Sequence, residues 1–316
     1  MELQTQIEIQ SPEERITYDS RILMLGSCFA ENVGKKLKYF RFTTDVNPFG
    51  IVYNPLSVRN VLDCLIEKRV FTEQDLLWND GKWVSLFHHG SFSSPDASTC
   101  LEHINVRLQR AAENIRVADW LMITFGTSWV YRHLASGSVA GNCHKLPAGE
   151  FERYRLSISE IVEAYTALIT RLTILNPNLK ILFTVSPIRH WKDGAHGNQL
   201  SKSVLLLAID ELVRQFKCAY YFPSYEIVMD ELRDYRFYAE DMLHISETGI
   251  EYIWNRFKEK LITPESYDFM KRIEKLNRGF AHRTEDTTSE AYQNFLSKLL
   301  TEQEELKKRL PGADFD

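Results

Sequence analysis

The chain carries a serine, an aspartate and a histidine at two places, and together these residue types can perform nucleophilic catalysis. Ser27 follows a short apolar run at residues 22–25 and a glycine, and an amphipathic helical pattern begins directly after it. Asp241 and His244 stand three positions apart, just before the last helical pattern of the α/β region. A serine hydroxyl needs a base to take its proton, histidine titrates near neutral pH, and a carboxylate can hold the histidine ring in one tautomer. We therefore predict that these two stretches form one active site.

The elements around Ser27 are typical of an open α/β sheet. A buried strand, a tight glycine turn and a helix leave Ser27 at the carboxyl edge of the sheet, beside the positive end of the helix, where such sheets bind ligands. Further apolar runs at residues 120–125 and 180–185 end at Gly126 and Ser186, with long amphipathic patterns between them. Strands that alternate with helices predict a parallel sheet with right-handed crossovers, and hence a three-layer α/β/α fold.

Individual elements and domains can also be placed. Pro55 suits the first position of a helix that runs to about residue 67. We expect irregular structure at residues 78–95, an insertion at 128–145, and a polar loop at 191–199 before a helix at 201–216. After residue 262 the composition shifts to charged helix formers, with two helices expected at 265–275 and 289–310 and a polar segment at 279–288 between them. We predict an α/β domain at residues 1–262 and a helical extension at 263–316, packed on the core or at an interface, through which a homo-oligomer could form.

Composition and charge argue against several classes of protein, such as nucleic-acid binders and membrane proteins. The chain has 316 residues, 44% hydrophobic and 26% charged, which is typical of a globular protein. A net charge of -5 and a pI near 6.0 argue against nucleic-acid binding. The first residues lack the charged start and apolar core of a signal peptide, and no apolar run reaches the roughly 18 residues of a membrane span. Five scattered cysteines without CxxC spacing favour reduced thiols. We expect a cytoplasmic protein.

Six segments of the chain resemble one known family. They are GSCFA at residues 26–30, NPFGIVYNP at 47–55, FGTSWVY at 125–131, NCHK at 142–145, SPIRH at 186–190 and DMLHIS at 241–246. The first segment is the signature that names the GSCFA family, which is similar to the SGNH (GDSL-like) hydrolases with their flavodoxin-like α/β/α fold. The resemblance implies that Ser27 is the nucleophile, His244 the general base and Asp241 its orienting partner.

One departure from the SGNH pattern concerns the oxyanion hole. SGNH enzymes usually carry an asparagine two residues after the glycine that ends the third core strand, and here Gly126 is followed by Thr127 and Ser128. The resemblance implies that the backbone N–H groups of Ser27 and Gly50 hold the oxyanion. The third donor is then Ser128 or, if its insertion folds inward, Asn142.

Other interpretations of single residues stay open. Ser27 suits an N-cap, and Cys28 is a rival nucleophile because a helix N-terminus lowers the pKa of a thiol. Cys143, His144, His190 and His244 together invite a zinc site, but their spacing matches no known zinc pattern, so we expect no metal. His88 and His89 are expected as a surface or loop pair. Candidate substrate contacts are Lys145, Arg189, His190 and Trp129, and an arginine can clamp a carboxylate or phosphate.

The residues and the resemblance together predict an SGNH-type serine esterase that cleaves a small-molecule or carbohydrate ester through an acyl-Ser27 intermediate, without a cofactor. An O-acyltransferase with the same three residues is a close alternative, because an insertion that excludes water favours transfer. A non-catalytic binding protein on a degenerate hydrolase fold is the alternative from another class. The sequence does not define the acyl group or the alcohol.

Overall fold

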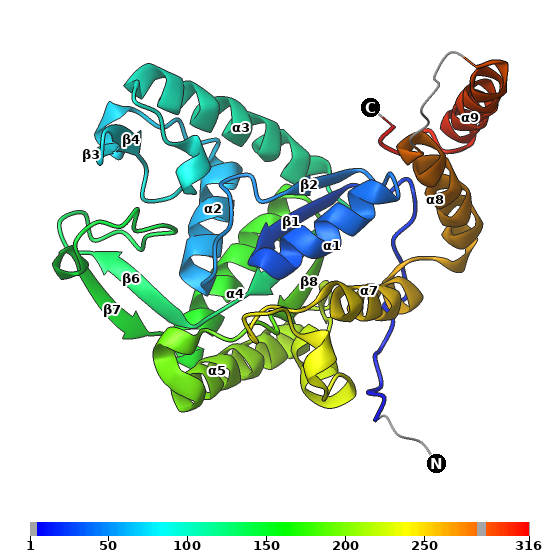
Figure 1. The fold of residues 1–316 in the computed structure, drawn as a ribbon. Helices are drawn as coiled ribbons and strands as arrows, with labels where there is room; N and C mark the ends of the chain where they lie inside the picture. The colour runs from blue at the N-terminus through cyan, green and yellow to red at the C-terminus, as the bar shows by residue number, and fades with distance from the viewer. Residues whose placement is uncertain (1–4, 283–288, 316) are drawn as a thin grey trace.

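The computed structural model describes residues 5–282 and 289–315, and within these ranges five strands form one parallel sheet (Figure 1). The strands are β1 (Ile22–Gly26), β2 (Thr44–Val46), β5 (Trp120–Phe125), β8 (Lys180–Val185) and β9 (Ala219–Tyr221). Their order across the sheet is β2-β1-β5-β8-β9. Numbered along the chain, the parallel strands therefore follow the order 2-1-3-4-5, which is the flavodoxin-like order. The predicted α/β fold with a central parallel sheet is confirmed.

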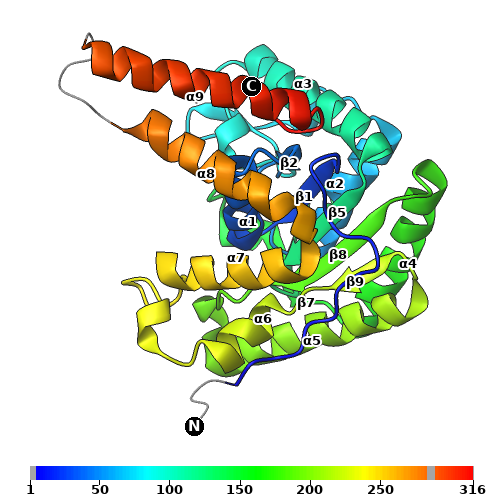
Figure 2. The same ribbon diagram turned by 90° about the vertical axis from the view of Figure 1, so that its right-hand side faces the viewer.

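Helices cover both faces of this sheet, because successive side chains of each strand point to opposite faces (Figure 2). One set of alternating strand residues, 23, 25, 121, 123, 181 and 183, shares a buried core with α2 (Pro55–Glu67), α3 (Ala97–Val117), α4 (Ile158–Leu175) and α5 (Gly194–Gln215). The other set, 22, 24, 120, 122 and 182, packs with α1 (Cys28–Tyr39) and α7 (Glu247–Leu261). The sheet is thus the middle layer of three.

Two antiparallel hairpins stand outside the central sheet. The first joins β3 (Leu77–Asn79) to β4 (Lys82–Val84), in a region expected to be irregular, so that prediction was wrong. Its turn has positive φ at both central residues, Asp80 and Gly81, and an Asp-Gly pair is a strong signal for such a hairpin. The second joins β6 (Trp129–His133) to β7 (Phe151–Arg155) and contains the expected insertion.

Short helical turns complete the α/β region. The predicted helix start at Pro55 is confirmed, with Asn54 accepting the capping hydrogen bond from Ser57 N–H. The predicted loop at 191–199 was wrong, because α5 already begins at Gly194, and its first turns are too polar to show an apolar period. The other turns are η1 (Glu73–Asp75), η2 (Gly90–Phe92), η3 (Ala148–Glu150), η4 (Trp191–Asp193), α6 (Ser224–Glu226), the π-helix η5 (Ile227–Glu231), η6 (Tyr235–Phe237) and η7 (Pro264–Ser266).

The C-terminal helices α8 (Tyr267–Ala281) and α9 (Glu290–Arg309) lie at the far side of the molecule from the β6–β7 hairpin (Figure 1). Apolar residues of α8 are buried in the core that α1 and α7 share, and Arg272 pairs with Glu302 of α9 at 2.7 Å. Of the polar segment expected at 279–288, residues 283–288 lie outside the described ranges. No helix among the described residues is long and apolar enough to cross a membrane.

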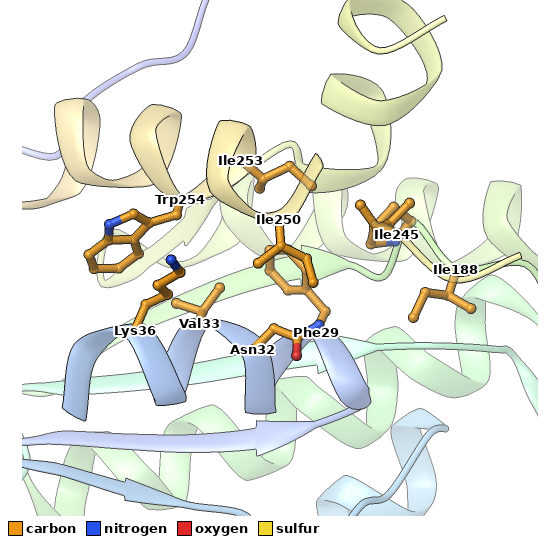
Figure 3. Close-up of a pocket in the computed structure, with 10 residues that line it drawn as sticks. Phe29, Asn32, Val33, Lys36, Ile188, Ile245, Ile250, Ile253 and Trp254 are labelled. Atoms are coloured by element: carbon orange, nitrogen blue, oxygen red, sulfur yellow. The ribbon is translucent and has the colours of Figure 1, made fainter. Parts of the chain in front are cut away.

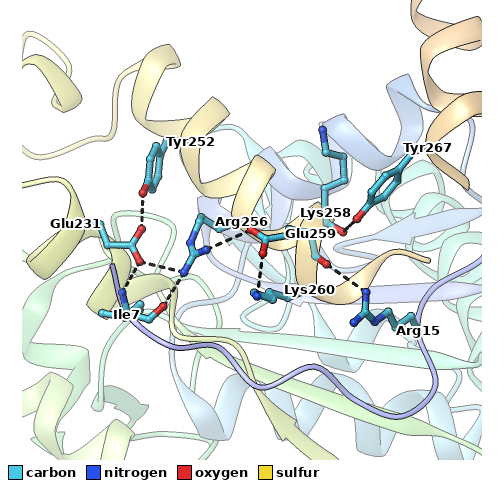
Figure 4. Close-up of polar contacts among 9 residues, drawn as sticks. All are labelled: Ile7, Arg15, Glu231, Tyr252, Arg256, Lys258, Glu259, Lys260 and Tyr267. Carbon is cyan, nitrogen blue, oxygen red and sulfur yellow. Dashed lines mark hydrogen bonds and ion pairs between the residues drawn. The ribbon is translucent and has the colours of Figure 1, made fainter. Parts of the chain in front are cut away.

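The N-terminal segment lies against α7 and fixes it from outside (Figure 4). The N–H of Ile7 donates to Glu231 at 2.9 Å, and Arg256 of α7 donates to the Ile7 carbonyl at 2.6 Å. Farther along, the N–H of Ile16 donates to the carbonyl of Leu261 at 2.7 Å. The helix that follows the Asp241–His244 loop is therefore held by residues from the start of the chain.

Candidate active site

The turn between β1 and α1 presents Ser27. Gly26 has φ +133°, and a Cβ there would collide with the carbonyl of Thr124 on the neighbouring strand, so the position requires glycine. Ser27 occupies the N-cap position of α1, but its hydroxyl makes no capping hydrogen bond. The residue is 2% exposed, and its Oγ has no hydrogen-bond partner among the described residues. A buried hydroxyl without a partner is rare in native proteins and points to a functional role.

The Asp241–His244 loop holds an aspartate and a histidine in direct contact. One carboxylate oxygen of Asp241 accepts the N–H groups of Leu243 and His244, both at 2.9 Å, and the other lies 2.5 Å from His244 Nδ1. The side-chain bond from His244, followed by the two backbone bonds, lowers the pKa of Asp241 to about 2. An ionised carboxylate only accepts hydrogen bonds, so Nδ1 carries the proton and Nε2 is left as the basic nitrogen.

A narrow apolar slit lies between α1 and α7, close in sequence to both halves of the predicted site (Figure 3). Phe29, two residues after Ser27, and Ile245, next to His244, both line it, together with Ile188 from the loop after β8. The slit has a volume of about 10 Å³, room for about one water molecule. Residues close in sequence to Ser27 and to His244 therefore line one slit together with the loop after β8, while Ser27, Asp241 and His244 themselves are not part of its lining.

The contact between nucleophile and base is not made in this conformation. Among the described residues, no hydrogen bond joins Ser27 to His244, and the His244 side chain is 54% exposed. Catalytic hydrogen bonds are often long or absent in unliganded enzymes and shorten when the substrate binds. The structure joins Asp241 and His244 by a hydrogen bond, and Ile245 next to them lines the same slit as Phe29, two residues after Ser27.

The backbone donors expected for the oxyanion already have partners. The N–H of Ser27 donates to Thr124 O at 3.3 Å, and the N–H of Gly50 donates to Asn47 O at 2.8 Å. Gly50 has φ +80°, and a side chain there would overlap His89, so glycine is required by the turn itself. Either N–H must leave its present acceptor before it can bind an oxyanion.

The side-chain donors considered for the same role face other parts of the protein. The Ser128 hydroxyl is fully buried and donates to Ser201 of α5 at 3.0 Å, and the Ser128 N–H bonds the same oxygen at 2.8 Å. The Asn142 side chain accepts the N–H of His144 at 2.8 Å and closes its own turn. Neither residue forms a hydrogen bond to Ser27 within the described chain.

Two residues at this edge were missed by the sequence analysis. Asn47 follows β2, accepts the N–H of Gly26 at 2.9 Å through Oδ1, and keeps its buried Nδ2 without a partner among the described residues. Lys202 is completely buried and donates to the carbonyls of Gly126 and Ser186, at 2.6 and 2.7 Å, which joins the carboxyl ends of β5 and β8. Lys202 was recognisable, because it continues the apolar stripe of Leu205, Ile209 and Leu212 at spacings of three and four.

Two residues near the Ser27 turn have shifted pKa values, which argue against Cys28 as the nucleophile and against a charged His190. Burial, followed by the charge of Glu31, raises the pKa of Cys28, so its thiol stays protonated at neutral pH and is a weak nucleophile. Burial, followed by Lys202, lowers the pKa of His190 to about 4, so this ring is neutral. His190 packs edge-on against the Tyr53 ring, with 5.7 Å between centroids. His190 is therefore an uncharged side chain that packs against Tyr53 at the edge of the sheet.

The other predicted contact residues are spread over the hairpin and the loop after β8. Trp129 is covered by the Arg153 guanidinium, 4.2 Å from the ring centroid, and Lys145 is exposed on the β6–β7 connection. Arg189 is half-buried and donates to the sulfur of Met229 at 3.3 Å. No three His, Cys, Asp or Glu side chains in the described ranges gather in a way that would hold a metal ion.

The adjacent histidines His88 and His89 lie in different environments. His88 was expected as part of a surface or loop pair, but its ring is 1% exposed and stacks on Phe49 with 4.2 Å between centroids. Burial lowers its pKa to about 3, so it is a neutral core residue. His89 is exposed, as expected.

Comparison with known proteins identifies the family. The GSCFA family model matches residues 21–257, and the model of the GSCFA domain protein C-terminal domain matches residues 273–316. The chain therefore belongs to the GSCFA family, as its motifs indicate. No curated protein matches the chain significantly.

Two solved structures are similar in fold at low identity. A family 3 carbohydrate esterase from Clostridium thermocellum has 10% identity and a TM-score of 0.38, covering 80% of this chain and 97% of its own. A protein from Streptococcus pneumonia, provisionally described as a platelet activating factor, has 13% identity and a TM-score of 0.39, covering 77% of this chain and 84% of its own. Scores this low say nothing about the substrate of this chain.

Proposed function

We propose that this protein is a serine esterase in which Ser27, His244 and Asp241 act as nucleophile, general base and orienting carboxylate. The Asp241–His244 hydrogen bond carries the proposal, because it leaves Nε2 as a base next to Ile245, which lines the same slit as Phe29, two residues after Ser27. The buried hydroxyl of Ser27, which has no partner among the described residues, supports it. Binding of an ester brings Ser27 and His244 into hydrogen-bond contact.

The reaction then proceeds in two halves. Ser27 Oγ attacks the ester carbonyl while His244 Nε2 takes the hydroxyl proton, and the tetrahedral intermediate expels the alcohol, which receives that proton. Water next attacks the acyl-Ser27 carbonyl, passes a proton to His244, and the acid leaves as the proton returns to Ser27 Oγ. Asp241 remains ionised throughout, because its pKa of about 2 lies far below neutral pH.

We further infer that Asn47 supplies an oxyanion donor in place of the asparagine that SGNH enzymes usually carry. Its Oδ1 is fixed by Gly26 N–H beside Ser27, so the amide orientation is determined and Nδ2 remains as a buried donor. Asn47→Asp keeps the acceptor for Gly26 and removes the donor. We expect a loss of about 100- to 1,000-fold in the acylation rate, with unchanged far-UV circular dichroism.

The exposure of His244 favours hydrolysis over acyl transfer to an alcohol. A transferase must exclude water from the acyl-enzyme, whereas the His244 side chain is 54% exposed here. Methanol or methyl glucoside added during turnover tests the alternative. Acyl transfer to these alcohols in preference to water would favour the transferase.

Intact-mass measurement after brief incubation with p-nitrophenyl acetate tests the proposal. Acetyl is the first probe because it is a small acyl group. We expect one acetyl group on the wild type and none on Ser27→Ala. Acetylation of Ser27→Ala would instead favour Cys28 as the nucleophile. Failure of the folded wild type to react with p-nitrophenyl acetate and with a serine-reactive phosphonate would favour a binding protein.

A further inference from the structure

A cleft of about 670 Å³ opens beside the Asp241–His244 loop and, among the described residues, shares no lining residue with the apolar slit. Three segments line it: residues 189–191 after β8, residues 228–238 around η5 and η6, and residues 241–243 of the loop itself. Small-molecule sites typically enclose about 300–1,000 Å³. The cleft is therefore large enough for one or two sugar rings next to the proposed base.

Aromatic side chains form an exposed wall of this cleft. Trp191 is 56% exposed, Tyr235 is more exposed still, and Tyr238 lies 6.3 Å from Tyr235 between ring centroids. Large aromatic residues grouped at a concave surface mark ligand-binding grooves, and their flat apolar faces stack on rings whose edges carry polar groups. A pyranose ring has this character, with C–H groups on its faces and hydroxyls around its edge.

One cation in the cleft has no anionic partner. Arg189 has no carboxylate within ion-pair distance among the described residues, and its recorded side-chain partner is the weak acceptor sulfur of Met229 at 3.3 Å. Of the other charged groups of the lining, Arg233 pairs with Asp230 and Asp234 with Arg236, and the ionised Asp241 carboxylate accepts hydrogen bonds from His244 and from two backbone N–H groups. A half-buried guanidinium with free donors fits a planar carboxylate or a phosphate.

We propose that this cleft binds an acidic sugar, a pyranose that carries a carboxylate or phosphate, as the alcohol part of the ester. Trp191 and the two tyrosines contact the ring, and Arg189 binds the anion. The position of the sugar as leaving group rests on the proposed esterase function, but binding of the sugar itself does not depend on acylation.

Isothermal titration of the full-length Ser27→Ala protein tests the binding. Methyl β-D-glucuronoside and glucose 6-phosphate are the acidic probes, methyl β-D-glucoside the neutral one and inorganic phosphate the free anion. We expect at least one acidic sugar to bind at least tenfold more tightly than the neutral glucoside and than phosphate. Equal binding of the neutral glucoside, tighter binding of phosphate alone, or no binding by any probe would each overturn the proposal.

Matched variants locate the site. Arg189→Met should weaken the acidic sugar at least tenfold and leave the neutral one unchanged, while Arg214→Met, at an exposed arginine of α5 whose partner Asp210 is also outside the lining, should change neither. The tryptophan fluorescence change on binding should be lost in Trp191→Phe and kept in Trp78→Phe, because both rings are 56% exposed but only Trp191 lines the cleft. An unaltered affinity of Arg189→Met would refute the assignment.

The sugar-binding and acylation experiments can give different outcomes, so they test the two proposals separately. Sugar binding without acetylation of Ser27 would leave the cleft as the site of a binding protein. Acetylation without sugar binding would keep the esterase and remove the acidic sugar as its alcohol.

Discussion

Lys202 provides a quantitative test of how the carboxyl edge of the sheet is built. Its Nζ donates to two backbone carbonyls and is wholly enclosed. A neutral amine has two N–H groups, which matches these two acceptors. Burial, followed by the charge of Arg189, lowers the pKa of Lys202 from 10.5 to about 7. The unfolded chain therefore binds this proton across a pH range in which the folded protein has released it.

The consequence for stability has a definite sign. Between pH 7 and about 10 the unfolded state binds more protons than the folded state at this residue, so the free energy of unfolding rises with pH. For pKa values of about 7 and 10.5, the rise from pH 7 to pH 9.5 is about 3 kcal/mol. The cysteines whose pKa is raised by burial act in the opposite direction, so the wild type alone does not isolate the effect.

The assay is urea unfolding of the wild type and of Lys202→Met at pH 7 and at pH 9.5. For each protein, the change in the free energy of unfolding between the two pH values is measured, and the two changes are compared. The wild type should gain about 3 kcal/mol more than the variant over this interval. Lys217→Met, at an exposed lysine just beyond the end of α5, is the control and should follow the wild type. Identical pH dependence in wild type and Lys202→Met would refute the reasoning, because it would mean that Lys202 does not release its proton on folding.

Three further substitutions test the site and its supports. Asp241→Asn should lower kcat for p-nitrophenyl acetate by a factor on the order of 1,000–10,000, because the histidine loses the carboxylate that fixes its tautomer. Gly26→Ala should reduce the free energy of unfolding by more than about 2 kcal/mol, since it adds a clash with Thr124 to a disfavoured φ. Arg256→Met should cost about 1.5–3 kcal/mol in urea unfolding, because it removes a charged donor that bonds both the buried Glu231 carboxylate and the Ile7 carbonyl.

Each of these three substitutions has a control substitution in the same protein. Glu240→Gln, next to Asp241, should leave kcat unchanged, and a loss equal to that of Asp241→Asn would contradict the role proposed for Asp241. Gly149→Ala has free space around it and should be neutral, so equal stability of the two glycine variants would show that the turn tolerates a side chain. Arg278→Met removes an exposed ion pair and should cost under about 1 kcal/mol, and an equal cost at Arg256 would contradict its buried role.

The strands and the Ser27 turn were predictable because their signals are local. Buried parallel strands are continuous apolar runs, so residues 120–125 and 180–185 were placed correctly, and Pro55 marked a helix start. The motif resemblance located the Asp241–His244 pair. The structure adds their hydrogen bond, which depends on the left-handed backbone of Met242 between them.

The donors around the site could not be predicted, because each depends on which acceptor a turn brings near. The Gly50 N–H donates to Asn47 and the Ser128 hydroxyl to Ser201, and neither acceptor is marked by a local sequence pattern. Lys202 differs, because its place on the apolar face of α5 could be recognised, although a lysine taken by itself is usually exposed.

The N-terminal segment has a consequence for how the chain reaches this structure. Ile7 bonds to Glu231 and to Arg256, partners separated from it by 224 and 249 residues (Figure 4). Contacts so far apart in sequence are slow to form, and during synthesis Ile7 cannot reach these partners until α7 has left the ribosome. The start of the chain and α7, which continues the His244 loop, therefore gain their mutual contacts in one step.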